Sequence, residues 1–278
     1  MDPRPAAVAR RLAGVRRVLA VTGGKGGIGK TSVAVGLALS LRGEGARVGL
    51  LDLDLWSPSD HVVLGIPRPR FQEERGLVPD VVAGLSFMSI AGIVGERPAL
   101  LRGEDISNAI LELLAVTIWG ELDVLVVDMP PGFGDTVLDV ARYLPRAEYV
   151  VVTTPSELTR ATTRKMLELL RRLELPVVGL VENLRRDGEA GVSAPAAGAP
   201  AGRGEGGETA APAGTSAAGR PADGDPRFLG AIRYDEGHET SLGDPARLRR
   251  TAFFRDVEAV AAAVAAVVAV AGSPTAPR

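Results

Sequence analysis

A glycine-rich loop near the N-terminus constrains the fold of this chain more than any other feature. Residues 24–31 match the pattern G-x-x-x-x-G-K-[S/T], and they follow a short apolar run, residues 18–22, that we interpret as a buried strand. The next segment, residues 30–41, has apolar side chains at helical spacing. In this order the elements form a turn whose backbone N–H groups can surround phosphates. The sequence therefore predicts an α/β fold with a phosphate site at this turn.

The residues of the glycine-rich loop are expected to have different roles. Lys30 should contact the β- and γ-phosphates of ATP, and Thr31 should ligate Mg²⁺. Only three lysines occur in the chain, Lys25, Lys30 and Lys165, and two of them lie in this loop. A chance glycine-rich turn is the alternative, and the full match in the right context argues against it. We expect ATP to be bound by Gly24, Lys25, Gly26, Gly27, Ile28, Gly29, Lys30, Thr31 and Ser32.

Acidic residues end two further predicted strands. Asp52 and Asp54 end residues 48–53, and Asp128 follows the fully apolar residues 124–127. Ligands of parallel sheets bind beyond the carboxyl ends of the strands. Asp128 would hold Mg²⁺ directly or through water, and Asp52 and Asp54 would position Mg²⁺ and orient the attacking water. Turn or capping chemistry is the alternative for each, and before Pro58 it stays a serious one for Asp52 or Asp54 taken singly.

The order of predicted elements indicates the fold class. Apolar strands at residues 85–90, 149–153, 177–181 and 228–232 alternate with helices at residues 106–119 and 157–173. This alternation is typical of a doubly wound, mostly parallel sheet covered on both faces. We expect a single domain over residues 1–278, with a flexible N-terminus at 1–15, a low-complexity disordered loop at 187–225 and a C-terminal helix at 245–272.

Composition excludes several classes of function. The net charge of −2 leaves no basic field that would hold nucleic acid or an anionic membrane. The most apolar run, residues 259–271, is shorter than the roughly 18 residues of a membrane span. The chain has no cysteine, so it contains no disulfide and no cysteine-ligated metal or iron–sulfur site of its own. We expect a soluble, cytoplasmic protein that binds neither nucleic acid nor membrane.

The histidines and tryptophans do not suggest a site. His61 and His238 have no companions at metal-ligand spacing, and we expect ordinary surface or loop residues. We expect Trp56 and Trp119 to pack against other side chains rather than to stack on bases.

Several segments together resemble one known family. The loop sequence G-K-G-G-I-G-K-T at residues 24–31, with lysine after the first glycine, resembles the deviant Walker A motif of the MinD/ParA/Mrp class. Residues 51–59 are similar to the segment D-A-D-I-Y-G-P-S of the Mrp group, which are ATPases that carry iron–sulfur clusters. Residues 119–135 follow W-G-E-L-D-Y-L-I-I-D-x-P-P-G-T-G-D, and residues 152–155 and 179–183 also fit. The resemblance extends over residues 16–184 and resumes weakly near residue 228.

The resemblance implies more than the residue spacing does. It implies a doubly wound fold in which two subunits enclose two nucleotides, so we expect an ATP-gated homodimer. Lys25 would cross the dimer interface to the partner's ATP, Asp54 would be the residue most closely tied to hydrolysis, and Asp52 would lie near Mg²⁺. Asn183 would contact adenine. The implied function is that of a Mg²⁺-dependent ATPase in iron–sulfur cluster assembly or transfer.

The chain departs from the Mrp pattern at the cluster ligands. Mrp proteins usually place C-x-x-C shortly after the asparagine that matches Asn183, whereas this chain has no cysteine there or elsewhere. We therefore expect a divergent member or a partner subunit, with a cysteine-containing partner or apo-protein client supplying the ligands. Phe133 replaces a usual threonine and Ser156 a usual glutamine.

Two other functions remain as alternatives. The first is a nucleotide-switched positioning protein like MinD or ParA, against which stands the lack of a basic amphipathic C-terminal helix and of a basic patch. The second is a regulatory module that holds ATP and turns it over slowly, against which stand the intact Asp52, Asp54 and Asp128.

Overall fold

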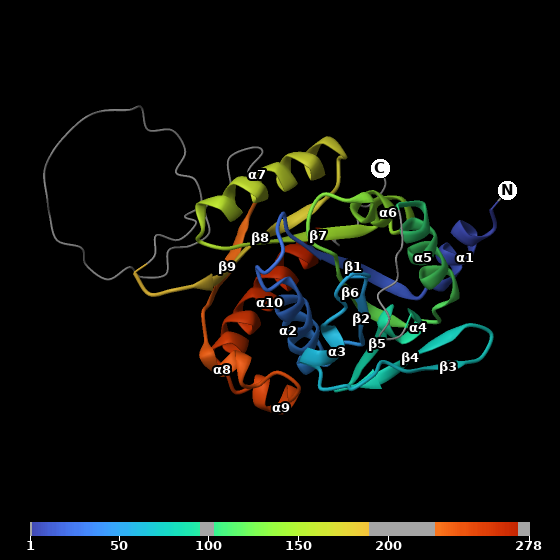
Figure 1. The fold of residues 1–278 in the computed structure, drawn as a ribbon, viewed down its shortest axis with the longest axis horizontal. Helices are drawn as coiled ribbons and strands as arrows, with labels where there is room; N and C mark the ends of the chain where they lie inside the picture. Colours follow the sequence, from blue (N-terminus) through green and yellow to red (C-terminus); the bar gives the residue numbers. More distant parts are fainter. Residues whose placement is uncertain (1, 95–102, 189–225, 272–278) are drawn as a thin grey trace, which may run out of the picture.

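A central sheet lies between two layers of helices in the computed structural model, which describes residues 2–94, 103–188 and 226–271 (Figure 1). The strands are β1 (Val15–Thr22), β2 (Val48–Asp52), β3 (Phe71–Glu73), β4 (Leu77–Val82), β5 (Leu85–Ser89), β6 (Leu122–Asp128), β7 (Ala147–Thr153), β8 (Val177–Arg185) and β9 (Phe228–Arg233). They form one nine-stranded sheet in the order β3-β4-β5-β2-β6-β1-β7-β8-β9. The predicted doubly wound, mostly parallel fold is confirmed.

Strand pairing brings the predicted functional residues to one edge of the sheet. β1 pairs in parallel with β6 and β7, and β2 pairs in parallel with β6 and β5. In the β2–β6 register Asp52 lies directly opposite Asp128. The carboxyl ends of β1, β2 and β6 therefore meet at the glycine-rich loop.

One hairpin of the sheet was not predicted. β3 and β4 are antiparallel to each other, and β4 is antiparallel to β5. Figure 1 shows this hairpin at the outer edge of the sheet. Its strands carry Gln72, Glu73 and Pro79, which interrupt the alternation of apolar and polar residues by which a strand is recognised. Charged residues and proline are typical of edge strands.

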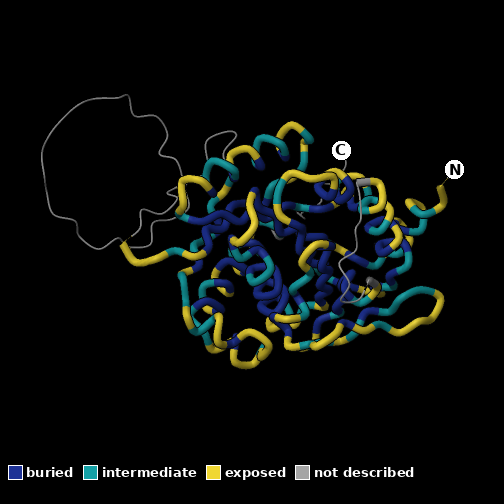
Figure 2. Tube along the Cα trace, viewed as in Figure 1, coloured by how far each residue is buried: buried dark blue, intermediate teal, exposed yellow. Residues whose placement is uncertain are grey.

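Helices cover both faces of the sheet. They are α1 (Arg4–Arg11), α2 (Lys30–Gly43), α3 (Asp60–Val63), α4 (Ala91–Val94), α5 (Gly103–Val116), α6 (Asp135–Tyr143), α7 (Glu157–Arg172), α8 (Glu236–Glu239), α9 (Pro245–Leu248) and α10 (Ala252–Ala271). Leu19 and Val21 of β1 pack with α2 and α10 on one face, whereas Val18 and Ala20 pack with α1, α5, α6 and α7 on the other. Because neighbours along each strand point to opposite faces, a strand buried on both sides is apolar throughout, as Figure 2 shows for the centre of the molecule.

The two ends of the chain differ from the predictions. Residues 1–15 were expected to be flexible, but Arg4–Arg11 form α1, which buries Val8 and is followed by the buried Leu12. The C-terminal helix expected at 245–272 is two helices, α9 and α10. Asp244 caps α9 by accepting hydrogen bonds from two backbone N–H groups, and Thr251 Oγ1 accepts one from Phe254 N at the start of α10.

Most of the low-complexity segment expected at 187–225 lies outside the described residues. Among the residues that the structure describes, no helix is both long and apolar enough to cross a membrane.

Candidate functional site

The glycine-rich loop is held in shape by neighbours from two other elements. Gly29 adopts a left-handed φ of +77°, and a Cβ there would collide with Asn183 Nδ2. Asn183, near the end of β8, donates from Nδ2 to the backbone oxygen of Ile28 at 2.9 Å. A Cβ on Gly24 would lie 2.7 Å from the backbone oxygen of Thr162 in α7. Glycine is therefore required at both positions, by backbone conformation at one and by close packing at the other.

Lys30 and Thr31 begin α2 and face the predicted magnesium aspartate. Lys30 is buried, with 6% of its surface exposed. Thr31 Oγ1 donates to Asp128 Oδ2 at 2.7 Å, and Ser59 Oγ donates to Thr31 Oγ1 at 3.3 Å. The structure thus brings together the three residues expected to serve phosphate and metal. Ser59 was not predicted to join them.

A third carboxylate, Asp60, joins Asp52 and Asp128. One ligand oxygen from each of the three lies within 4.8 Å of the others, and all three residues are buried. Ser89 Oγ donates to Asp52 at 3.1 Å. By contrast, both carboxylate oxygens of Asp60 and Oδ1 of Asp128 have no donor among the described residues. These three are the carboxylate oxygens of the cluster for which the described residues supply no donor.

Burial makes the ionised forms of these carboxylates costly. Burial first, and then the charge of Asp128, raises the pKa of Asp52 above its ordinary value. The same two causes, burial and neighbouring carboxylates, raise the pKa of Asp60. Burial also raises the pKa of Asp128, while the ammonium of Lys30 acts in the opposite direction. When protonated, Asp60 can share its proton with Asp128; when ionised, the three need a cation.

Asp54 has a different environment from Asp52. Its Oδ1 accepts hydrogen bonds from the backbone N–H groups of Trp56 and Ser57, each at 3.1 Å. Its contacts in this structure are therefore those of the turn that was considered as the alternative. Trp56 is 60% exposed, so the expectation that it packs is wrong, whereas Trp119 is buried as predicted.

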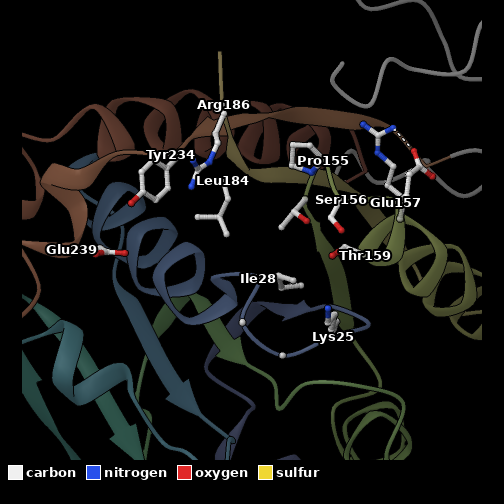
Figure 3. Close-up of a pocket in the computed structure, with 14 residues that line it drawn as sticks. Lys25, Ile28, Pro155, Ser156, Glu157, Thr159, Leu184, Arg186, Tyr234 and Glu239 are labelled. Carbon is white, nitrogen blue, oxygen red and sulfur yellow. Dashed lines mark hydrogen bonds and ion pairs between the residues drawn. The ribbon is translucent and has the colours of Figure 1, made fainter. Parts of the chain in front are cut away.

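A cleft of about 640 Å³ opens beside the glycine-rich loop. We call it the loop cleft; it is lined by Lys25, Gly26, Gly27, Ile28, Thr154, Pro155, Ser156, Glu157, Thr159, Arg160, Leu184, Arg186, Tyr234 and Glu239. Figure 3 shows Lys25 and Ile28 on the loop side and Arg186, Tyr234 and Leu184 at the other end. Lys25 is exposed at its rim, so its ammonium is free to reach outward.

Residues 14–193, more than half of the chain, match the family described as ParA: NUBPL iron-transfer P-loop NTPase. The chain belongs to the ParA/NUBPL family. The predicted resemblance to the MinD/ParA/Mrp class is therefore confirmed.

Individual ParA/NUBPL relatives share part of this chain. It is 44% identical to an iron–sulfur cluster carrier protein of Pseudomonas fragi over 177 residues. These residues cover 62% of this chain and 62% of the relative. The match thus spans less than two thirds of that relative. An ADP-bound nucleotide-binding protein of Archaeoglobus fulgidus has a TM-score of 0.63 at 25% identity, covering 88% of this chain and 93% of that one. The MinD cell division ATPase of Pyrococcus furiosus has a TM-score of 0.60 at 18% identity, covering 91% and 99%, and shows the shared fold alone.

In this ParA/NUBPL chain the far end of the loop cleft is formed by residues that were not predicted to belong to a site. Leu184 has a left-handed φ of +59°, beside an irregularity in the β8–β9 pairing, and it lines the cleft. The guanidinium carbon of Arg186 lies 4.6 Å from the ring centre of Tyr234. Neither Tyr234 nor Arg186 was predicted as a site residue, because no motif identifies a side chain that faces a cleft.

The remaining sequence candidates have ordinary surroundings. His61 lies half-buried in α3, and His238 in α8 has its ring centre 4.2 Å from that of Phe253. Phe133, which replaces a usual threonine, is 42% exposed in the loop after β6. Ser156 lies at the lining of the loop cleft.

Proposed function

We propose that this chain is a Mg²⁺-dependent ATPase of the Mrp type, which acts as an ATP-gated dimer in iron–sulfur cluster assembly or transfer. The observation that carries the proposal is the assembled site: Lys30, Thr31 and Asp128 converge at a glycine-rich loop beside an open cleft. The family match and the iron–sulfur carrier relative support the cluster role. The alternative of a positioning ATPase has support from the fold alone.

The loop cleft suits a nucleoside triphosphate. Phosphates would lie on the backbone N–H groups of the glycine-rich loop and at the N-terminus of α2, with Lys30 neutralising their charge. The base would lie toward Leu184 and Tyr234. Asn183 Nδ2 donates to the backbone oxygen of Ile28, while its buried Oδ1 has no donor among the described residues. That oxygen is an acceptor suited to an amino group such as the one on adenine.

The residues beside the loop fit Mg²⁺. Thr31 offers a hydroxyl, Asp52 a carboxylate, and Asp128 a carboxylate whose Oδ1 has no donor within the described chain. These are the hard oxygen ligands that Mg²⁺ prefers. When bound, Mg²⁺ neutralises charge on the phosphate oxygens of the nucleotide.

Lys25 and Asp54 are proposed to act in turnover. Lys25 is exposed at the cleft rim, where its side chain can extend to a nucleotide on a second copy of the chain. Asp54 would accept a hydrogen bond from the attacking water. Because its Oδ1 already accepts from Trp56 N and Ser57 N, that role requires the free oxygen Oδ2 or a rearranged turn.

The cluster is proposed to be cargo that this chain does not ligate. Where Mrp proteins carry cysteines, this chain continues from Asn183 into Arg185 and Arg186, and it contains no cysteine. Thiolates are the usual ligands of iron–sulfur clusters. A cysteine-containing partner or apo-protein client would therefore hold the cluster while this chain supplies the nucleotide-dependent association.

Two measurements on the full chain test the proposal. Phosphate release from Mg·ATP should be lost in Lys30→Ala and retained in Lys165→Ala, which removes an exposed lysine of α7. Anaerobic purification from the native host should yield iron on a co-purifying cysteine-containing protein. Turnover that is equal in Lys30→Ala and the unmodified chain would refute the ATPase role, and iron-free partners in every preparation would refute the cluster role.

A further inference from the structure

Asp60 is the residue of the site that the ATPase chemistry leaves without a role. It is the first residue of α3, and its carboxyl group is completely buried. The short helix is held in the core by Val63 and Leu64, which are 5% and 3% exposed, and by the hydrogen bond from Ser59 to Thr31. Packing of its neighbours therefore forces the Asp60 carboxylate toward Asp52 and Asp128.

We propose that Asp60 completes, with Asp52 and Asp128, a site that binds a hard divalent cation in the absence of any nucleotide. The proposal shares Asp52 and Asp128 with the magnesium set above but does not depend on ATP binding or turnover. In the proposed Mg·ATP site the triphosphate contributes much of the negative charge around Mg²⁺. In the nucleotide-free site three protein carboxylates supply that charge.

The hydrogen bonds of the three aspartates indicate room for a bound cation. Both oxygens of Asp52 have donors, Asp54 N at 3.0 Å and Ser89 Oγ at 3.1 Å. Asp128 Oδ2 accepts from Thr31, but Asp128 Oδ1 and both oxygens of Asp60 have no donor among the described residues. Buried polar atoms are nearly always paired. One cation would satisfy these three carboxylate oxygens together, whereas a proton shared between Asp60 and Asp128 reaches only one oxygen of each residue.

The spacing of the oxygens fits an ion. One oxygen from each of Asp52, Asp60 and Asp128 lies within 4.8 Å of the others. Opposite ligands of an ion are separated by twice the metal–oxygen distance, which is about 4.2 Å for Mg²⁺ and about 4.8 Å for Ca²⁺. The three oxygens can therefore contact one ion with small side-chain adjustments.

The local charge favours the same conclusion. Among the described residues, Lys30 is the cation whose charge acts on Asp128, and it faces four carboxylates, since Asp54 also acts on Asp52, Asp60 and Asp128. Each ionised carboxylate disfavours the ionised form of its neighbours. A divalent cation removes this repulsion, and an all-oxygen ligand set selects Mg²⁺, Mn²⁺ or Ca²⁺ over metals that prefer nitrogen or sulfur.

Mn²⁺ alone is the probe for the experiment. Electron paramagnetic resonance titration of the full chain without nucleotide should show one bound Mn²⁺, displaced by excess Mg²⁺. Asp60→Asn should weaken this binding at least tenfold. The matched control Asp139→Asn should bind Mn²⁺ as the unmodified chain does, because Asp139 is a buried aspartate of α6 that is paired with Ser107.

Thermal unfolding separates a ligand role from a structural one. Added Mn²⁺ should raise the midpoint of the unmodified chain and leave that of Asp60→Asn nearly unchanged. An equal rise of the midpoint on addition of Mn²⁺ in Asp60→Asn and in the unmodified chain would overturn the proposal.

Two outcomes distinguish this inference from the proposed ATPase function. If the unmodified chain binds Mn²⁺ only together with ATP, the nucleotide-independent site is wrong while the ATPase proposal stands. If Asp60→Asn binds Mn²⁺ as tightly as the unmodified chain, Asp60 is not a ligand. Cation binding without any ATP turnover would support the site and count against the ATPase proposal.

Discussion

The packing of Gly29 against Asn183 yields a quantitative prediction about the glycine-rich loop. Gly29 has φ +77°, and a methyl group there would collide with Asn183 Nδ2. Alanine in a left-handed conformation costs roughly 1–2 kcal/mol. To relieve the collision, Asn183 must also give up its hydrogen bond to Ile28, which costs about 1–3 kcal/mol when the oxygen is left buried and unpaired. Gly29→Ala should therefore destabilise the fold by about 2–5 kcal/mol.

A double-mutant cycle separates the two contributions. Asn183→Ala alone loses the hydrogen bond to Ile28 and should cost about 1–3 kcal/mol. In Gly29→Ala/Asn183→Ala the collision is gone and the hydrogen bond is lost only once. The double variant should therefore be as stable as Gly29→Ala to within about 0.5 kcal/mol, well short of the sum of the single effects.

Urea unfolding followed by circular dichroism measures all four proteins of this cycle. The control is Gly132→Ala, because Gly132 also has a positive φ, +93°, but nothing lies within 4 Å of a Cβ placed there. It should lose only the conformational part. If the effects of Gly29→Ala and Asn183→Ala simply add, the two residues do not share one contact and the reasoning is wrong.

Three further predictions concern the cleft, the dimer and the response to pH. Lys25→Ala should still bind ATP but lose most turnover and, in sedimentation, its ATP-dependent dimerisation. The control Lys165→Ala should keep both. Normal dimerisation of Lys25→Ala would make Lys25 an ordinary loop residue. Tyr234→Ala should weaken ATP binding by about 1–3 kcal/mol, from lost base stacking, and leave inorganic tripolyphosphate binding unchanged; equal losses for both ligands in calorimetry would exclude a base contact. Burial lowers the pKa of His238, against the opposing charges of Asp235 and Glu239. The unfolded chain therefore binds more protons, and the free energy of unfolding should fall as pH drops through about 6.5. Thermal melts of His238→Gln should show a shallower fall; an unchanged slope would assign the effect elsewhere.

The sequence by itself determined the parts of the site that depend on local chemistry. The glycine-rich loop was predicted because its phosphate geometry requires a contiguous run of residues between a strand and a helix. Asp52 and Asp128 were predicted because each ends an apolar strand, and parallel strands bring such ends to one edge. The mostly parallel sheet followed from the same uninterrupted apolar strands. These signals lie within a few neighbouring residues, so one sequence suffices to find them.

Short elements escaped sequence reasoning. α1 has eight residues, of which only Val8 is buried, so its apolar pattern is too brief to identify a helix. The β3–β4 hairpin lies at the sheet edge, where burial does not impose alternation. Asp54 was expected to act with Asp52, which ends β2, yet the Asp54 carboxylate accepts hydrogen bonds from its own turn.

Tertiary structure alone decided which oxygens share a buried place. Asp60 lies in a four-residue helix just after the matched segment 51–59, and its sequence neighbours do not indicate that it is buried. It meets Asp52 and Asp128 because β2 and β6 pair in register and because α3 packs with its apolar residues inward. The far end of the loop cleft has the same origin, since Leu184 lies in β8 whereas Tyr234 follows β9. Contacts between residues distant in the chain depend on the packing of whole elements, and no local pattern encodes them.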